Sequence, residues 1–386
     1  MQGVAPSLVF CALPFSQDAS NGGIARTSGG VPSSRGCPNG TEGCAARKCS
    51  CADRRQAKLV SPVRAPPNSS RHLVAWKNAI AKSASRHAVL SILRTALIVY
   101  VATVRAREPG QADSFPPGGT LGLSVAENPP PGVYIFNQAS YSDAWVTDAG
   151  TTFESGPRVR VGAESVKLIW STPWEIFGAK ELMFIIQPYV HVKLSDFPEL
   201  GNQTRQSGNF ANTGFEPINL SWNLGTDLYG SLHFGFYAPA LNYSQTSGIN
   251  AGNNFWTLEP EAAFSYVGHG CNLTLHLVYT TNTKNPSTDY RSGDQIVLDI
   301  TATQTLRRTE VGLVGYLSDQ VTADKNGGKF YANDLPQTEP FRFALGPLVG
   351  YFLGRYHIQA YFTRDLIARD GAEKGNHVWT NITLPF

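Results

Sequence analysis

Apolar and polar side chains alternate in runs along most of residues 132–386, and Gly, Asn, Asp and Pro separate these runs. Residues 258–266 and 273–279 follow a period of two, and so do residues 356–362. A period of two places successive side chains on opposite faces of a β-strand. Because no stretch of this segment shows the pattern of an amphipathic helix, the sequence predicts an all-β fold.

The predicted strands are long, at about 11–15 residues each, whereas strands of soluble domains average about 5–6. A strand that crosses a lipid bilayer needs about 9–11 residues. The pattern therefore predicts a closed antiparallel transmembrane β-barrel of about twelve strands. The predicted strands span residues 132–145, 157–170, 180–194, 215–225, 228–242, 255–267, 270–282, 290–306, 308–319, 341–353, 354–366 and 376–386.

Connectors between the predicted strands largely alternate between short turns and long polar loops. Outer-membrane barrels show this alternation, with short periplasmic turns and longer outer loops. In a closed barrel the last strand, residues 376–386, must pair with the first. This last strand ends on Phe386, an aromatic residue at the lipid-facing parity. It resembles the C-terminal signal that barrel-assembly machinery recognises, and we assign that role to Phe386.

The charge of the chain divides at Asp113. Of the 32 Lys and Arg residues, 15 precede this position, whereas only 4 of the 29 Asp and Glu residues do. Cys271 is the one cysteine after it, so residues 132–386 cannot form an internal disulfide. Residues 1–72 lack any hydrophobic period, which predicts an extension that is disordered or lies upstream of the true start. This extension contains the cysteines Cys37, Cys44, Cys49 and Cys51, whose spacing C-x6-C-x4-C-x-C fits no usual zinc motif.

Residues 73–112 have the order of features that is typical of a secretory signal peptide. Basic residues precede an apolar run at residues 88–104, and small residues follow at Ala106 and Ala112. As a membrane-spanning helix the run is short, and Arg94 would lie in the middle of the span. We expect cleavage after Ala106 or Ala112 and localisation in a bacterial outer membrane.

Polar residues at the parity opposite the lipid face would point into the lumen of such a barrel, and the Pro- and Gly-rich residues 113–131 could plug it. One interpretation is that the lumenal polar groups only hydrate the interior. Another interpretation is that a ring of four carboxylates favours cations, formed by Glu259, Glu261, Asp294 and Asp299. In this interpretation tyrosines offer stacking surfaces to a solute. The residues expected in the lumen are Glu259, Glu261, His276, Asp294, Asp299, Tyr189, Tyr316 and Tyr361.

The sequence contains no recognisable catalytic, phosphate-binding or metal motif. A barrel enzyme of the outer-membrane lipase kind would need a Ser–His pair facing the lipid, but His233 and His276 take the inward parity. We therefore expect no enzyme, no metal or cofactor and no nucleic-acid partner. The expected partners are outer-membrane lipids, the barrel-assembly machinery and small hydrophobic or aromatic solutes.

Six motifs occur in one order along about residues 120–386. They are ENPPPGVYIFNQASYSD (127–143), YAPALNY (237–243), NNFWTLEPEAAFSY (253–266), YRSGDQIVLD (290–299), VGLVGYLSDQVTAD (311–324) and ALGPLVGY (344–351). Together they resemble the outer-membrane proteins named for the meta-pathway of phenol degradation. In one departure, Ala-Leu stands in YAPALNY where the family pattern has Thr-Gly.

The resemblance implies an outer-membrane channel for the passive uptake of small hydrophobic or aromatic molecules. A general small-solute porin that favours cations is the alternative within the same fold. A secreted β-sandwich that acts as a binding module is the alternative of another class, because a sandwich shows the same alternation of side chains.

Overall fold

The computed structural model describes residues 108, 110–147, 157–196, 203–331 and 339–386. Every regular element in these ranges is a β-strand. Within the same ranges, no helix is long and apolar enough to cross a membrane. The predicted extension at residues 1–72 and most of the predicted signal region at residues 73–112 lie outside the described residues, so both stay predictions.

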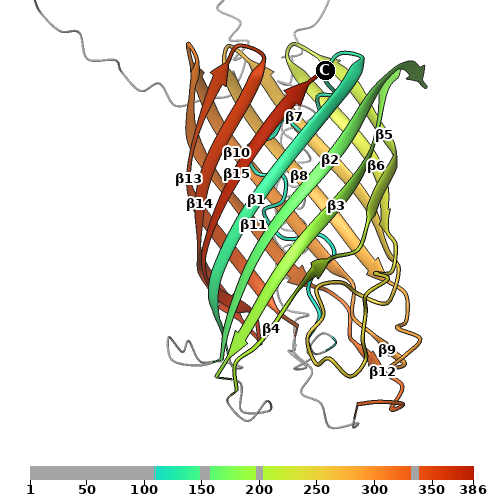
Figure 1. Cartoon of the computed structure of the whole chain (residues 1–386). Coiled ribbons are helices and arrows are strands. Elements are labelled where there is room, and N and C mark those ends of the chain that lie inside the picture. The colour runs from blue at the N-terminus through green and yellow to red at the C-terminus, as the bar shows by residue number, and fades with distance from the viewer. Residues whose placement is uncertain (1–107, 109, 148–156, 197–202, 332–338) are drawn as a thin grey trace, which may run out of the picture. The chain divides into compact units, whose positions relative to one another are not determined.

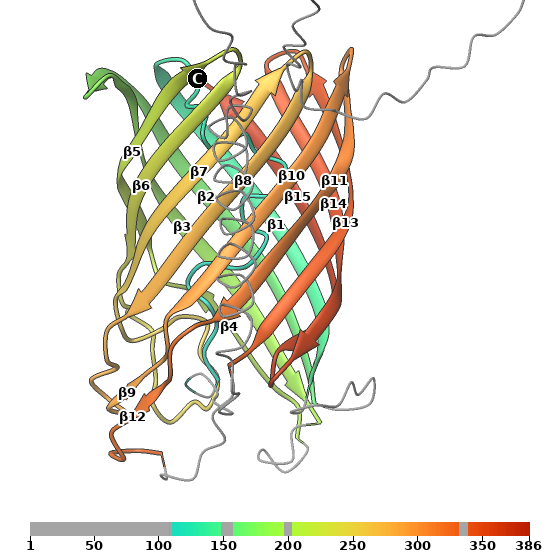
Figure 2. The ribbon, with the colours of Figure 1, turned by 180° about the vertical axis from the view of Figure 1, so that it is seen from behind.

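In the described part of the chain, twelve strands form a closed antiparallel ring, which confirms the predicted barrel and excludes a β-sandwich (Figures 1 and 2). Each strand of the ring pairs with the next one along the chain, and β15 pairs with β1 to close it. The strands are β1 (Gly132–Val146), β2 (Arg158–Ile176), β3 (Ala179–Ser195), β5 (Gly214–Gly225), β6 (Leu228–Tyr237), β7 (Thr257–Gly268), β8 (Cys271–Asn282), β10 (Gln295–Leu306), β11 (Thr309–Gln320), β13 (Phe341–Leu353), β14 (Tyr356–Arg369) and β15 (Glu373–Pro385).

The outer face of the barrel is apolar. On β7 the side chains of Leu258 and Phe264 are exposed, whereas Glu259, Glu261 and Ser265 on the other parity are buried. Large exposed apolar residues also occur on the other strands of the ring. A continuous apolar surface of this kind suits contact with lipid rather than with water.

The two ends of the barrel differ as the connector lengths predicted. Two-residue turns join strands at the end that we call the short-turn end; in the turn between β7 and β8, His269 and Gly270 both have positive φ, at 55° and 79°. Such φ values suit the type I′ hairpin turn. Most of the longer connectors gather at the opposite end, the long-loop end (Figure 1).

Three short strands lie at the long-loop end. β4 (Arg205–Phe210) pairs with β3 outside the ring, and β9 (Tyr290–Arg291) pairs with β12 (Lys325–Asn326). β4 and β12 were not predicted from the sequence, and β9 was predicted as the start of a single strand over residues 290–306, whose ring part begins only at Gln295. These segments are short and mostly polar, so they carry no run of alternating residues long enough to recognise.

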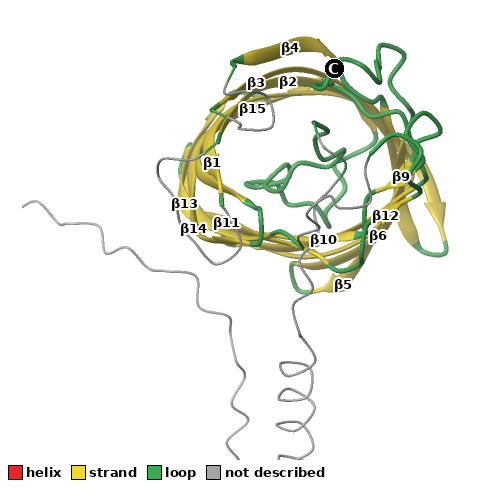
Figure 3. Cartoon of the chain, turned by 90° about the horizontal axis from the view of Figure 1, so that it is seen from below, coloured by secondary structure: helices red, strands yellow, loops and turns green. Residues whose placement is uncertain are grey.

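Residues 110–131, called the lumen segment below, run inside the barrel (Figure 3). At the long-loop end, Asn253 Nδ2 donates a hydrogen bond to the carbonyl of Ala112 at 3.0 Å. At the short-turn end, Asn128 Nδ2 donates to the carbonyl of Lys180 at 3.1 Å. The segment therefore passes along the lumen from one end of the barrel to the other before β1 begins.

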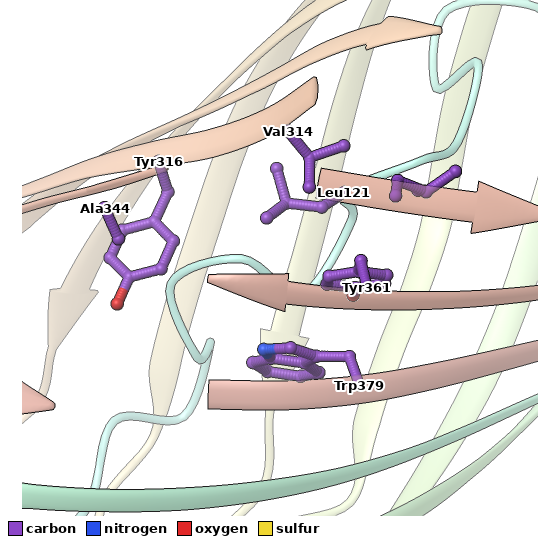
Figure 4. Close-up of a cluster of buried hydrophobic side chains, with 7 residues drawn as sticks. Leu121, Val314, Tyr316, Ala344, Tyr361 and Trp379 are labelled. Atoms are coloured by element: carbon purple, nitrogen blue, oxygen red, sulfur yellow. The ribbon is translucent and has the colours of Figure 1, made fainter. Parts of the chain in front are cut away.

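Leu121 connects the lumen segment to the wall of the barrel, and its side chain is fully buried. Two of its neighbours, Tyr361 and Trp379, stack with ring centroids 5.8 Å apart and nearly parallel planes. The cluster around Leu121 is a hydrophobic core inside the barrel, where apolar side chains pack on one another because the outer face of a barrel in lipid supplies no protein core (Figure 4). Its members are Leu121, Val314, Tyr316, Ala344, Leu348, Tyr361 and Trp379.

Candidate functional site in the barrel lumen

A cavity of about 730 Å³ lies between the lumen segment and the inner face of the barrel. It extends from His276, midway along β8, to the short-turn end, where Asp227, His269 and Gly270 line it. Part of its wall is apolar and contains several aromatic rings. The apolar lining residues include Phe115, Phe136, Ile169, Leu182, Phe184 and Phe352.

One positive charge lies against this apolar wall. Lys167 Nζ lies 3.8 Å from the ring centroid of Phe184 and 5.8 Å from that of Phe136. At these distances the ring faces attract the ammonium group. The wall can therefore contact an apolar molecule through its rings while Lys167 offers a hydrogen-bond donor.

Carboxylates and imidazoles form another part of the cavity wall. Glu261 Oε2 lies 2.7 Å from His276 Nε2 and 3.7 Å from His233 Nδ1. His233 Nδ1 also lies 3.7 Å from Glu216 Oε1. All four side chains are buried. Such a group can hold a cation or a proton, because it combines negative charge with imidazole nitrogens in a site shielded from bulk water.

Strand register brings these residues together. Glu261 on β7 pairs directly with His233 on β6, and His276 on β8 pairs directly with Asp299 on β10. Residues directly opposite each other on neighbouring strands project from the same face of the sheet. All four have the inward parity, so their side chains meet inside the barrel although they are distant in the sequence.

Asp299 joins this group to the lumen segment. It accepts hydrogen bonds from the backbone N–H groups of Gly118 and Thr120, each at 3.0 Å, and from Thr120 Oγ1 at 2.8 Å. Thr120 Oγ1 also lies 2.9 Å from His276 Nδ1. The lumen segment is thus tied to the wall at the level of the histidine and carboxylate side chains.

A second His–Glu pair is formed by residues of β11 and β14. His357 Nε2 lies 2.8 Å from Glu310 Oε2, and Gln359 Nε2 donates to the same oxygen at 2.9 Å. Gln359 Nε2 also donates to the carbonyl of Gly122. This pair lines the same cavity and makes a further contact with the lumen segment.

A polar cluster outside the strands of the ring forms around Glu108 at the long-loop end. Its carboxylate accepts hydrogen bonds from Thr288 Oγ1 at 2.6 Å and from Asn285 Nδ2 at 3.0 Å. Burial raises the pKa of Glu108 above its ordinary value, although these hydrogen bonds oppose the rise. The cluster joins the start of the described chain to the loop that precedes β9.

The residues expected in the lumen have several different positions. Glu259, Glu261, His276 and Asp299 are buried on the inward parity, and the first three line the cavity. Tyr316 and Tyr361 are also buried on the inward parity, but they pack in the Leu121 cluster rather than along the cavity. The lumen segment covers them, so a solute in the cavity does not reach their rings.

The prediction that Tyr189 lines the lumen is wrong. Its side chain is 46% exposed and contacts Phe210 of β4 edge-to-face at 5.4 Å. On β3, the inward positions include Leu182 and Phe184 instead. The pairing of β3 with β2 runs without a shift from Leu182 past Tyr189, so Tyr189 has the parity opposite to these lining residues and points outward. On β3 the more apolar parity faces the lumen, so the expectation that the apolar parity faces lipid fails on this strand.

The prediction that Asp294 belongs to a lumenal carboxylate ring is also wrong. Asp294 accepts hydrogen bonds from Tyr279 Oη and Thr281 Oγ1 at 2.9 and 2.7 Å. Tyr279 shares its parity with the exposed Leu277, so this contact lies on the outward side of β8. Because Asp294 and Asp299 are five residues apart, an extended chain places them on opposite faces.

Sequence reasoning missed Lys167, Glu216 and Phe184 as lining residues of the cavity. Lys167 occurs in a run that alternates clearly, so its parity could have identified it. Glu216 lies beside an extra residue in β5, which interrupts the parity counted from the sequence. Phe184 has the parity of β3 that was expected to face lipid.

A sequence profile of the family described as "Putative MetA-pathway of phenol degradation" matches residues 142–382. This match covers more than half of the chain. The chain belongs to this family. A comparison with curated proteins finds no match.

Among solved structures, the chain is similar to an outer membrane channel from Pseudomonas putida F1, with 14% identity and a TM-score of 0.59. That likeness covers 71% of this chain and 100% of the channel. The translocator domain of the autotransporter NalP from Neisseria meningitidis matches with 10% identity and a TM-score of 0.42, covering 68% of this chain and 91% of that domain. At this identity, the channel from Pseudomonas putida F1 supports the barrel fold alone.

The motifs by which the chain resembles its family contact the lumen segment. Asn253, in the NNFWTLEPEAAFSY motif, holds the carbonyl of Ala112, and Asp299, at the end of YRSGDQIVLD, holds Thr120. In the latter motif, Gly293 N also donates to Asp324 Oδ1 at 2.6 Å, which ties β9 to the loop after β11. The motifs therefore position the lumen segment and the long loops in this member of the family.

Proposed function

We propose that this family member is a channel of the bacterial outer membrane through which small hydrophobic or aromatic molecules pass. The observation that carries this proposal is an apolar, aromatic-lined cavity inside a closed ring whose outer face is also apolar. An apolar wall binds a hydrophobic solute by removing its surface from water. The apolar outer face places the ring in a membrane.

We orient the barrel with the short turns toward the periplasm and the long loops toward the outside, as in other outer-membrane barrels. The cavity then communicates with the periplasmic end, where Asp227 and His269 line it. Toward the outside, the lumen segment and the loops pack together through the bond between Asn253 and Ala112. In this proposal, the lumen segment must shift for a solute to cross the whole barrel.

A cation-favouring pore for small solutes is the second candidate, and a specific observation supports it. Glu216, Glu259 and Glu261 line the cavity, and the one Lys among its lining residues is Lys167. This balance makes the lumen negative, which attracts cations and repels anions. The aromatic wall nevertheless favours the hydrophobic solute, because a pore for hydrated ions gains nothing from exposed rings.

We propose that the chain is not an enzyme, although Ser–His pairs exist among the described residues. Ser142 Oγ lies 2.8 Å from His377 Nδ1, but neither residue lines the cavity. Ser231 Oγ lies 2.7 Å from His233 Nε2, and His233 Nδ1 faces Glu261. Ser231 is 4% exposed and is not among the residues that line the cavity. A substrate in the cavity therefore has no access to the hydroxyl, which a nucleophile requires.

The test compares uptake of an aromatic solute with ion conductance in liposomes that contain the refolded chain. The double change Phe136→Ala and Phe184→Ala removes two rings from the cavity wall, so it should lower solute uptake while ion conductance persists. Phe264→Ala is the matched control, because Phe264 is 58% exposed on the outer face. Uptake equal to that of the control would refute the aromatic route. Two results together would favour the cation pore. The Glu259→Gln, Glu261→Gln double variant would lose its preference for cations, and the Phe136→Ala, Phe184→Ala double variant would take up the aromatic solute as before.

A further inference from the structure

The group of side chains at the middle of the cavity has the composition of a metal site. His233 on β6, Glu261 on β7 and His276 on β8 each offer one ligand atom, and these three atoms all lie within 4.8 Å of one another. All three side chains are buried. Two imidazoles and a carboxylate suit Zn²⁺ and related ions. We propose that these residues bind a divalent transition-metal ion such as Zn²⁺ inside the barrel.

Hydrogen bonding at His276 turns the unprotonated nitrogen of a neutral imidazole toward Glu261. Thr120 Oγ1 donates its proton to Asp299 Oδ2, so it accepts from His276 Nδ1. A neutral imidazole then carries its proton on Nδ1 and turns the lone pair of Nε2 toward Glu261 Oε2 at 2.7 Å. Two lone pairs at this distance repel each other, so either a proton lies between them or a metal ion beside them binds both atoms.

The geometry at His233 favours a metal ion over a proton. Its Nδ1 lies 3.7 Å from both Glu261 Oε2 and Glu216 Oε1, which is too long for a hydrogen bond. Bonds of about 2.0–2.1 Å at tetrahedral angles separate ligand atoms by about 3.3 Å. To bind a metal ion, His233 Nδ1 and Glu261 Oε2 would therefore move about 0.4 Å closer together, and His276 Nε2 and Glu261 Oε2 about 0.6 Å farther apart.

The charge of the cavity wall is an independent reason for a cation. Carboxyl groups on the cavity wall outnumber the single ammonium group of Lys167; they belong to Glu127, Glu216, Asp227, Glu259, Glu261 and Glu310. Glu259 is 3% exposed, and among the described residues its Oε1 has no hydrogen-bond partner. A buried carboxylate oxygen without a partner is costly. A divalent ion beside Glu261, two residues along β7, offsets this charge.

Neighbouring hydroxyl groups hold both imidazoles in place. Ser231 Oγ lies 2.7 Å from His233 Nε2, and Thr120 Oγ1 lies 2.9 Å from His276 Nδ1. Metal-binding histidines usually have such a partner on the ring nitrogen that does not bind the ion. Because Thr120 belongs to the lumen segment, the proposed ion would also help to hold that segment, and the cavity gives the ion a route from the short-turn end.

The test is a calorimetric titration of the refolded full chain in detergent with Zn²⁺ alone. The cysteines are alkylated first, because thiolates also bind zinc. We expect one saturable site that excess Mg²⁺ or Ca²⁺ does not displace. His233→Ala and His276→Ala should each abolish this site, and Thr120→Val should weaken it about 10–100-fold, as loss of a supporting partner does.

His357→Ala is the matched control, because it removes a histidine that is paired with a lumenal Glu310 at 2.8 Å but lies outside the proposed site. It should bind Zn²⁺ like the unaltered chain. A change in gel mobility on boiling shows that each variant is folded. Absence of a saturable site would leave a proton between His276 and Glu261 and would overturn the proposal, as would unchanged binding in both histidine variants. The measurement involves no transport, so its outcome is separate from that of the proposed function.

Discussion

Replacing Leu121 by Ala is expected to release the lumen segment from the wall of the barrel. Leu121 is fully buried in a cluster that includes Tyr361 and Trp379. Changing such a Leu to Ala costs about 2–5 kcal/mol, through lost burial and the cavity left behind. The pairing between strands does not involve this side chain, so the loss falls mainly on docking of the segment. Since about 1.4 kcal/mol is a tenfold change, the undocked population should rise about 30- to 4,000-fold.

Single-channel recording in planar bilayers measures this release, because an undocked segment opens the lumen. We expect Leu121→Ala to open more often or to conduct more than the unaltered chain. Leu313→Ala is the matched control, since Leu313 is 47% exposed on the outer face of β11, beside the buried Val314. Identical traces from Leu121→Ala, Leu313→Ala and the unaltered chain would show that docking of the segment does not limit conduction.

Asp299→Ala should also loosen the lumen segment and make it more sensitive to added protease than in the unaltered chain, because three donors lose their charged acceptor. Glu259→Gln with Glu261→Gln should reduce the preference for cations in reversal-potential measurements, and an unchanged potential would remove these residues from the ion path. The pKa of Glu108 is raised in the folded chain, so its protonated form is favoured there. The loop cluster should therefore hold best at acid pH and loosen as pH rises through that pKa. Proteolysis of the loops should show this trend, and Glu108→Gln should flatten it.

Most of the barrel could be predicted from the sequence because side-chain parity is a local property of an extended chain. Neighbouring residues such as Leu258 and Glu259 point to opposite faces whatever the rest of the fold does. The predicted starts and ends of the strands agree closely with the structure for β1, β7 and β13, since Gly, Asn and Asp mark the turns. Closure of the barrel could also be predicted, because a membrane-spanning strand cannot leave its backbone edge unpaired.

The candidate site could be predicted only in part. Parity placed Glu259, Glu261 and His276 inside the barrel, but it did not show that Glu261 lies between two histidines. That contact depends on the register between β6, β7 and β8, which no short spacing in the sequence records. For the same reason no metal site was predicted, since motif patterns detect ligands that are close together along the chain.

The sequence by itself determined an all-β chain with long strands, an apolar outer parity and connectors that alternate in length, because each of these is encoded within a few consecutive residues. The tertiary structure decided that the apolar parity of β3, with Leu182 and Phe184, faces the lumen, and this placed Tyr189 on the outer face. It also decided that Leu121 covers Tyr361, and that Thr120 joins Asp299 to His276. These contacts join residues more than a hundred positions apart, and only closure of the ring around the lumen segment brings them within reach.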